Sequence, residues 1–229
     1  CGHKLGAGFH IHTAESQADQ LNCESQHKMR VVERLRDFGI LGRKSIAAHC
    51  VHVSEREVEI LKETGTAVVH NPQSNANNSV GIADVTGLME KGVLVGLGTD
   101  AMTVNMMEEV RVALWLQHLK RDPSQGFMEV SKALLVNNAE IANRYFTGLG
   151  ELKAGAAADL AIIDYIPPTP MDADNFSGHL IFGISQSTVD TTIAAGKVLM
   201  EGKELKLDLD EEELSRKSAE LAKRLWSRF

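Results

Sequence analysis

Residues 45–70 of the chain read SIAAHCVHVSEREVEILKETGTAVVH, and this stretch decides the fold. It begins with a short run of small and apolar residues, which is typical of a buried strand, and it ends with a second such run at 66–70. Between them, Ser54 is followed three residues later by Glu57, the pattern of a helix capping box. Strand, helix and strand in this order predict a parallel βαβ unit, in which each strand ends at a histidine.

The same alternation continues on both sides of this unit. Strands are expected over 7–13, 45–50, 66–70 and 93–97, and helices over 23–38, 54–64, 83–91, 106–120 and 128–146. The continuity of the last helix near Asn137 is open, and a polar loop with four asparagines is expected over 71–81. Because a closed (β/α)₈ barrel takes about 250 residues, four βα units predict an α/β fold that makes half of a TIM-type barrel.

Residues 151–229 follow a different pattern, and we therefore expect two segments, 1–150 and 151–229. The second segment is predicted to contain short strands, an extended linker held by prolines, a short helix and a terminal helix with acidic residues first and basic residues last. In chain order these elements are the strand 159–164, the linker 166–170, the helix 179–184, the strands 189–195 and 198–200, and the helix 210–226.

The chain has 229 residues, of which 43% are hydrophobic, and a formal net charge of −7, values typical of a globular protein. An acidic chain is a poor partner for nucleic acid or an anionic membrane, and no apolar run approaches the ~20 residues of a membrane-spanning helix. Cys1, Cys23 and Cys50 are spaced too irregularly for a disulfide framework, which favours a reducing cytoplasm. Because the chain starts with Cys1 and its first methionine is Met29, we expect a piece of a longer protein.

Polar residues stand at the carboxyl ends of four successive predicted strands. They are His12, His49, His70 and Asp100. In βα barrels this end carries the active site, and packing alone rarely produces such a series. His10 and His12 share one face of their strand, where they are either metal ligands or hydrogen-bonded core residues. Counted with the other strand ends, His12 is the better candidate for a metal ligand.

Two carboxylates accompany these histidines. Glu15 follows His12 by three residues, where it either performs acid–base chemistry beside a metal or is an ordinary acid at a helix start. Asp100 ends a strand that contains Gly96 and Gly98, whose small size allows close approach of a loop or ligand. Asp100 can bind a metal and accept a proton from water, or it can cap a turn.

The remaining candidates carry weaker signals. His49 is expected to be functional, and His52, which lies beyond it, either to support the residues of the site or to be merely structural. His70 either lines a pocket or orients the loop that follows it. Asn75 is the best candidate for an amide that contacts a heterocycle, although asparagine also simply forms turns. For the other histidines we expect packing or surface roles; these are His3, His27, His118 and His179.

Four motifs together resemble the amidohydrolase superfamily, in its metal-dependent deaminase and triazine chlorohydrolase branch. They are HTAES at 12–16, AAHCVH at 47–52, HNPQSN at 70–75 and LGTDA at 97–101. The later run DYIPPTPMDADNFSGHLIFG, at 164–183, resembles the SsnA group of aminohydrolases. The resemblance covers essentially the whole chain.

This resemblance implies a barrel that holds one divalent ion, zinc or alternatively iron. His12 and Asp100 match the family's metal ligands, with His49 as a weaker third candidate. Glu15 matches its proton shuttle, His49 the group that polarises the new oxygen or holds the water, and Asp100 also the acceptor of the water's proton. His70 and Asn75 are expected to bind substrate.

The resemblance also places this chain within the family's architecture. The family's first metal motif, His-x-His, belongs to a strand that would precede residue 1. The chain therefore corresponds to the C-terminal half of the barrel, strands 5–8 with their helices. The C-terminal strands of a small β-sandwich and the terminal helix follow.

The expected reaction is the hydrolytic deamination of a small, purine-like amino-heterocycle by metal-activated water. Alternatives are a dechlorinating or other hydrolase on the same scaffold, a catalytically inactive piece, or a non-enzymatic binding module, which leaves the strand-end pattern unexplained. We expect the 229-residue chain alone to bind metal weakly, to turn over no substrate and to self-associate through an open sheet edge, with a homo-oligomer as a candidate assembly.

Overall fold

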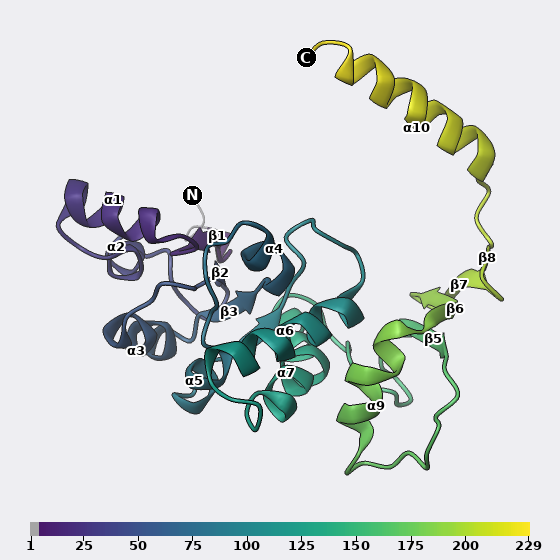
Figure 1. The fold of residues 1–229 in the computed structure, drawn as a ribbon, viewed down its shortest axis with the longest axis horizontal. Helices are drawn as coiled ribbons and strands as arrows, with labels where there is room; N and C mark the ends of the chain where they lie inside the picture. The colour runs from purple at the N-terminus through teal and green to yellow at the C-terminus, as the bar shows by residue number, and fades with distance from the viewer. Residues whose placement is uncertain (1–4) are drawn as a thin grey trace. The chain divides into compact units, whose positions relative to one another are not determined.

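The computed structural model describes residues 5–229, so Cys1 and His3 lie outside the described residues (Figure 1). Contacts divide the chain into two units, each of which is described by itself. The first unit runs to Ala157 and also contains Tyr165–Ser187, and the second contains Ala158–Asp164 and Thr188–Phe229. The segment Tyr165–Ser187 therefore groups with the first unit, whereas the sequence segments place it after residue 150.

The first unit is built on a four-stranded parallel sheet. Its strands β1 (His10–Thr13), β2 (Ile46–His49), β3 (Ala67–His70) and β4 (Val95–Leu97) are hydrogen-bonded in the order β1-β2-β3-β4. Each strand is joined to the next by helical segments, which makes the expected βα units, and the expected α/β fold with part of a barrel is confirmed. Because all four strands are parallel, their carboxyl ends meet at one edge of the sheet.

The helices that join these strands differ from the expected ones in two places. The helices are α1 (Gln17–His27), α2 (Val31–Asp37), α3 (Glu55–Thr64), α4 (Pro72–Asn77) and α5 (Val85–Glu90). The single helix predicted over 23–38 is wrong, because Lys28 adopts a left-handed conformation with φ 59° and ends α1. The loop predicted over 71–81 is also partly wrong, because Pro72 begins the short helix α4.

After β4 the chain is mostly helical. It forms α6 (Met106–Lys120), α7 (Phe127–Lys132), the π-helix η2 (Ala133–Asn137) and α8 (Asn138–Ala142), so the helix expected over 128–146 is interrupted before Asn138. The short helix α9 (Phe176–Phe182) and the 3₁₀ turn η3 (Ile184–Gln186) complete this unit.

Asparagine side chains cover the outer edge of β4. Asn137 Nδ2 donates to the carbonyl of Val95 at 2.7 Å, and Asn138 both accepts from Leu97 N at 2.9 Å and donates to Leu97 O at 3.0 Å. These bonds replace the pairing that a neighbouring strand would give. The prediction of an open sheet edge is therefore wrong for β4, where asparagine side chains bond the backbone of Val95 and Leu97.

Two apolar clusters pack against the sheet. The first joins the outer residues of the strands to the helices α2, α3 and α5, and its members include Val32, Ala47, Ile60, Leu61, Val68, Val85 and Val95. The second joins the end of β4 to the later helices, and it consists of Leu97, Val110, Ala113, Leu114, Val130, Ala133 and Ile181. Burial of these side chains holds the carboxyl ends of the strands in fixed positions.

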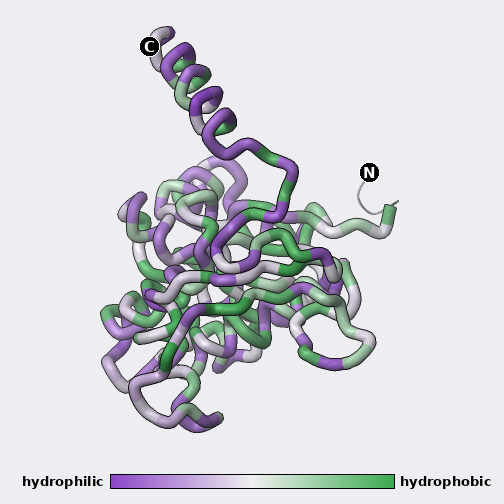
Figure 2. Tube along the Cα trace, turned by 90° about the vertical axis from the view of Figure 1, so that its right-hand side faces the viewer, coloured by the Kyte–Doolittle hydropathy of each residue, from purple (hydrophilic) through white to green (hydrophobic). Residues whose placement is uncertain are grey.

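The second unit is an antiparallel sheet followed by a helix. Its strands β5 (Leu160–Asp164), β6 (Thr188–Ala194), β7 (Lys197–Glu201) and β8 (Glu204–Leu205) pair in chain order, which confirms the three expected strands and adds a short fourth. In α10 (Glu211–Trp226), hydrophobic and hydrophilic residues alternate at helical spacing (Figure 2), and none of its residues is buried. Across residues 5–229, no helix combines the length and the apolar character needed to cross a bilayer.

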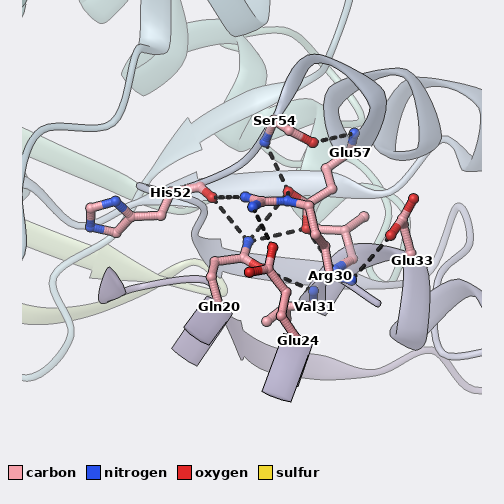
Figure 3. Close-up of polar contacts among 9 residues, drawn as sticks. Gln20, Glu24, Arg30, Val31, Glu33, His52, Ser54 and Glu57 are labelled. Atoms are coloured by element: carbon pink, nitrogen blue, oxygen red, sulfur yellow. Dashed lines mark hydrogen bonds and ion pairs between the residues drawn. The ribbon is translucent and has the colours of Figure 1, made fainter. Parts of the chain in front are cut away.

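A buried carboxylate fixes the loop that follows β2 (Figure 3). Glu57 is fully buried and accepts hydrogen bonds from Ser54 N at 2.8 Å, Val32 N at 3.0 Å and Arg30 Nε at 2.6 Å. Gln20 Nε2 also donates to Glu57, and both Gln20 and Arg30 donate to the carbonyl of His52. This network joins α1, α2 and α3 to the chain just beyond His49.

We expect Glu57→Gln to destabilise the fold by about 3 kcal/mol at neutral pH, because Arg30 loses its buried partner. Burial opposes the charge, but the hydrogen bonds from Ser54, Arg30 and Val32 outweigh it and hold the pKa of Glu57 below its ordinary value of 4.5. This stabilisation is therefore complete above pH 4.5 and is lost as the pH falls through the lower folded pKa. Urea unfolding between pH 7 and pH 3 measures it.

The matched control is Glu59→Gln on the same helix, whose carboxylate pairs with Arg56 at the surface. It should change the unfolding free energy by less than about 1 kcal/mol. A difference between wild type and Glu57→Gln that stays constant down to pH 3 would contradict the ionised role of Glu57.

Candidate active site

The carboxyl ends of β1, β2 and β4 bring three side chains together. His12 lies on β1, His49 is the last residue of β2, and Asp100 follows β4 by three residues. One ligand atom from each lies within 4.8 Å of the other two, and this is the one such group of metal-ligand side chains within residues 5–229. Register alone does not explain the approach of the histidines, because His12 pairs with Ala48 and His49 with Thr13, on opposite faces of regular strands. The left-handed conformation of His49, with φ 72°, interrupts this alternation at the strand end.

The distances within this cluster are close to those of a shared ion. His12 Nε2 lies 4.0 Å from Asp100 Oδ1, and His49 Nε2 lies 3.8 Å from Asp100 Oδ2. The rings of His12 and His49 are 5.2 Å apart at their centroids. The His12 side chain is 73% exposed and that of His49 is fully buried, so the cluster lies where the interior meets the open face of the sheet.

The backbone at these strand ends is strained. Ala14 (φ 48°), His49 (φ 72°), Cys50 (φ 50°), Asp100 (φ 46°) and Ala101 (φ 58°) all adopt left-handed conformations without being glycine. Each such residue costs about 1 kcal/mol or more, and strain of this kind concentrates at functional sites. Left-handed residues therefore occur at or just beyond the carboxyl ends of β1, β2 and β4, the three strands that supply the cluster.

Glu15 is the fourth group at this edge. Its Oε2 lies 3.7 Å from His49 Nε2, and its Oε1 accepts a hydrogen bond from Asn78 Nδ2 at 3.3 Å. Two carboxylates, those of Glu15 and Asp100, therefore face the same buried nitrogen. Such a pair can accept a proton at one oxygen and deliver it from another.

His70 and Asn75 are both fully buried beneath this edge. Asn75 Oδ1 accepts from His49 Nδ1 at 2.8 Å, and Asn75 Nδ2 donates to His70 Nδ1 at 3.3 Å. Burial, with a further contribution from His49, lowers the pKa of His70 to about 3, so its ring is neutral at physiological pH. Both side chains face His49 from the interior, and neither presents a polar atom to the open face.

The residues of the cluster fit a zinc ion. Bonds from zinc to nitrogen or carboxylate oxygen are about 2.0–2.2 Å long, so two atoms on one ion lie at most about 4.2 Å apart. Each of the two pairs, at 3.8 and 4.0 Å, meets this limit through a different oxygen of Asp100. His49 Nε2 is also buried without a hydrogen-bond partner among the described residues, as a nitrogen that binds a metal or a water would be.

Several residues of this site carried no clear sequence signal. Ser74 Oγ donates to Asp100 Oδ2 at 2.5 Å, and Asn78 contacts Glu15, although both were read as loop residues. Their place in the asparagine-rich run was the only available sign. His52, expected to have a supporting or structural role, bonds the carbonyl of Val80 at 2.6 Å. A Cβ on Gly98 would overlap Asn71 Oδ1, in keeping with the close approach expected at the glycines of β4.

A family model described as Amidohydrolase family matches residues 2–199, which is most of the chain. The chain belongs to the amidohydrolase family. This membership confirms the resemblance to the amidohydrolase superfamily, together with the parallel-barrel fold class, whereas the resemblance to the SsnA group stays a prediction. It does not assign roles to individual side chains of this amidohydrolase, which stay predictions.

Curated relatives of this amidohydrolase include several deaminases. A 5-methylthioadenosine/S-adenosylhomocysteine deaminase of Dictyoglomus thermophilum is 37% identical over 92% of this chain and 50% of its own length. A 5′-deoxyadenosine deaminase of Methanosarcina mazei is 34% identical over 97% of this chain and 52% of its own length. The chain thus spans about half the length of the curated relatives it matches.

Solved structures share the fold of this amidohydrolase. An adenosine deaminase from Xanthomonas campestris, crystallised with bound zinc, superposes with a TM-score of 0.87 at 25% identity, over 99% of this chain and 52% of its own. An atrazine chlorohydrolase from Arthrobacter aurescens, in complex with zinc, gives a TM-score of 0.82 at 21% identity, over 96% of this chain and 49% of its own. The second similarity shows the fold alone.

Proposed function

We propose that the whole protein hydrolytically deaminates the adenine ring of a 5′-modified adenosine, releasing ammonia. The observation that carries the proposal is the pair of carboxylates, Glu15 and Asp100, that face His49 Nε2 at 3.7 and 3.8 Å. Deamination needs one group to take a proton from water and another to return a proton to the ring. The printed activities of the curated relatives support the nucleoside substrate.

In this proposal the metal is zinc, held by His12 and Asp100 with His49 beside them. Zinc in the similar adenosine deaminase supports zinc over iron. A divalent ion at this place lowers the pKa of a water ligand to about 7, which supplies hydroxide at neutral pH. Because the cluster lies at the carboxyl ends of the parallel strands, the ion would lie at the edge where βα barrels bind their substrates.

Three side chains would act on the water and the substrate. Asp100 accepts a proton from the attacking water and later returns it to the amine nitrogen. Glu15 protonates a ring nitrogen next to the carbon that carries the amine, and it recovers a proton from the new hydroxyl group when the carbonyl forms. His49 accepts a hydrogen bond from the attacking water at Nε2 and holds it beside that carbon, and ammonia then leaves as the carbon–nitrogen bond breaks. Cys23 and Cys50 are buried and free, which supports a cytoplasmic protein.

The test is product analysis with the zinc-loaded whole protein and 5′-deoxyadenosine as probe. We expect one ammonia for each molecule of deaminated nucleoside, with no ammonia from the His12→Ala variant. A dechlorinating reaction has support only from the fold, and a chlorinated triazine offered in parallel should release no chloride. Chloride release without ammonia, or no turnover of either probe, would overturn the proposal.

A further inference from the structure

We propose that the segment Asn71–Asn78, which contains α4, is a positioning element that orients the three reacting groups of the site, an inference that rests on the proposed function. Three of its side chains each hold a different group. Ser74 Oγ donates to Asp100 Oδ2 at 2.5 Å, Asn75 Oδ1 accepts from His49 Nδ1 at 2.8 Å, and Asn78 Nδ2 donates to Glu15 Oε1 at 3.3 Å.

The segment is itself fixed to the rest of the unit. Pro72 presets the first turn of α4, and Gln73 N donates to Glu109 Oε2 on α6 at 3.2 Å. Beyond α4, the carbonyl of Val80 bonds His52, which belongs to the loop held by the Glu57 network. Both ends of the segment are therefore anchored to elements that lie far away in the sequence.

The contact with Asn75 determines which ring nitrogen of His49 carries the proton. A carbonyl oxygen can only accept, so His49 Nδ1 must be the protonated nitrogen at the 2.8 Å contact. Asn71 Nδ2 lies 3.5 Å from the same nitrogen, at the outer limit of hydrogen bonding, and does not compete with it. With its proton on Nδ1, the His49 ring presents the lone pair of Nε2 to the cluster, as a metal ligand or an acceptor from water requires.

The contact with Ser74 divides the two oxygens of Asp100. The hydroxyl donates to Oδ2, which also faces His49, whereas Oδ1 faces His12 at 4.0 Å. Rotation of the carboxylate would break the 2.5 Å bond, so the hydroxyl holds one oxygen in place for each histidine. Asn78 restrains Glu15 in the same way, but from the exposed side of the segment.

A positioning role differs measurably from the substrate contact that sequence analysis favoured for Asn75. Asn75 is fully buried and both polar atoms of its amide are bonded to histidines, so loss of its side chain should not weaken substrate binding directly. We expect Asn75→Leu to lower kcat and zinc affinity by ~10–100-fold each, with KM changed by less than ~3-fold. Asn75→Asp keeps an acceptor for His49 Nδ1 and should restore most of both quantities.

The experiment compares Asn75→Leu, Asn75→Asp, Ser74→Ala and Asn78→Ala with a control, Ala76→Ser, on the exposed side of the same helix. Zinc affinity is measured by competition with a chelator, and nitrogen-15 NMR of labelled histidine reports which nitrogen of His49 is protonated. Wild type and Asn75→Asp should show the proton on Nδ1, and Asn75→Leu should not. Ser74→Ala should lose zinc affinity. Asn78→Ala should instead lower kcat by ~10-fold and keep the wild-type affinity for zinc.

Two results would overturn the positioning role. The first is that the His49 proton stays on Nδ1 in Asn75→Leu while Ser74→Ala binds zinc with wild-type affinity. The second is that Asn75→Leu raises KM and changes neither kcat nor zinc affinity. Ser74→Ala removes a single oxygen atom, so it gives a readout if Asn75→Leu fails to fold. Because NMR and zinc affinity do not require turnover, they test the positioning role even if 5′-deoxyadenosine proves not to be deaminated.

Discussion

Replacing Glu15 by glutamine should lower kcat for 5′-deoxyadenosine by ~10²–10⁴-fold, the usual contribution of an acid–base group. Glutamine keeps the size of the side chain and the hydrogen bond from Asn78, but it cannot release a proton to the ring. Bound zinc should stay at the wild-type level, because Glu15 lies outside the cluster of His12, His49 and Asp100. Steady-state kinetics and metal analysis of the same preparation measure both quantities.

The control for this variant is Glu55→Gln, which removes the same charge from an exposed side chain at the start of α3. It should retain wild-type kcat and zinc. If Glu15→Gln loses as much zinc as His12→Ala, then Glu15 is a ligand and its assignment as a proton shuttle is wrong.

His12→Ala should remove both bound zinc and activity. Its Nε2 is one of three nitrogen and oxygen atoms within 4.8 Å, and loss of a direct ligand should weaken zinc binding by more than the ~10–100-fold typical of groups that only orient ligands. Zinc is measured after gel filtration in chelator-treated buffer, and kcat is measured at saturating zinc to separate weak binding from lost chemistry.

The chain supplies a close control on the same strand. His10 shares the exposed face of β1 with His12, two residues away, but lies outside the cluster. His10→Ala should therefore keep its zinc. Equal zinc loss from His10→Ala and His12→Ala would contradict the assignment of His12 alone as the direct ligand on β1.

The sequence predicted the strand ends better than the elements between them. His49 and His70 end their strands as expected, because short apolar runs followed by a polar residue leave little choice of register. The break between α1 and α2 was missed because no glycine or proline marks it in the sequence, although Lys28 adopts a left-handed and Arg30 an extended conformation. Helix α4 was missed because Asn71–Asn78 has the composition of a turn, and its stability comes from contacts made elsewhere in the chain.

The contacts around the candidate residues could not be inferred in the same way. Ser74 reaches Asp100 across 26 positions, and Arg30 reaches Glu57 across 27. A motif records which residues are present, but not which side chain of another element will donate to them. Glu57 shows the difference, since its sequence signal as a capping residue is correct and its partnership with Arg30 lies outside any local pattern.

The left-handed residues at the strand ends matter to anyone who would transplant this site into another scaffold. Grafting His12, His49 and Asp100 onto ordinary extended strand ends would copy the chemistry without the turn that follows each strand. The host would need to tolerate positive φ at the equivalents of His49 and Asp100, with enough surrounding packing to compensate for the strain. A suitable scaffold is therefore chosen first by its backbone torsion angles and only afterwards by the side chains it can carry.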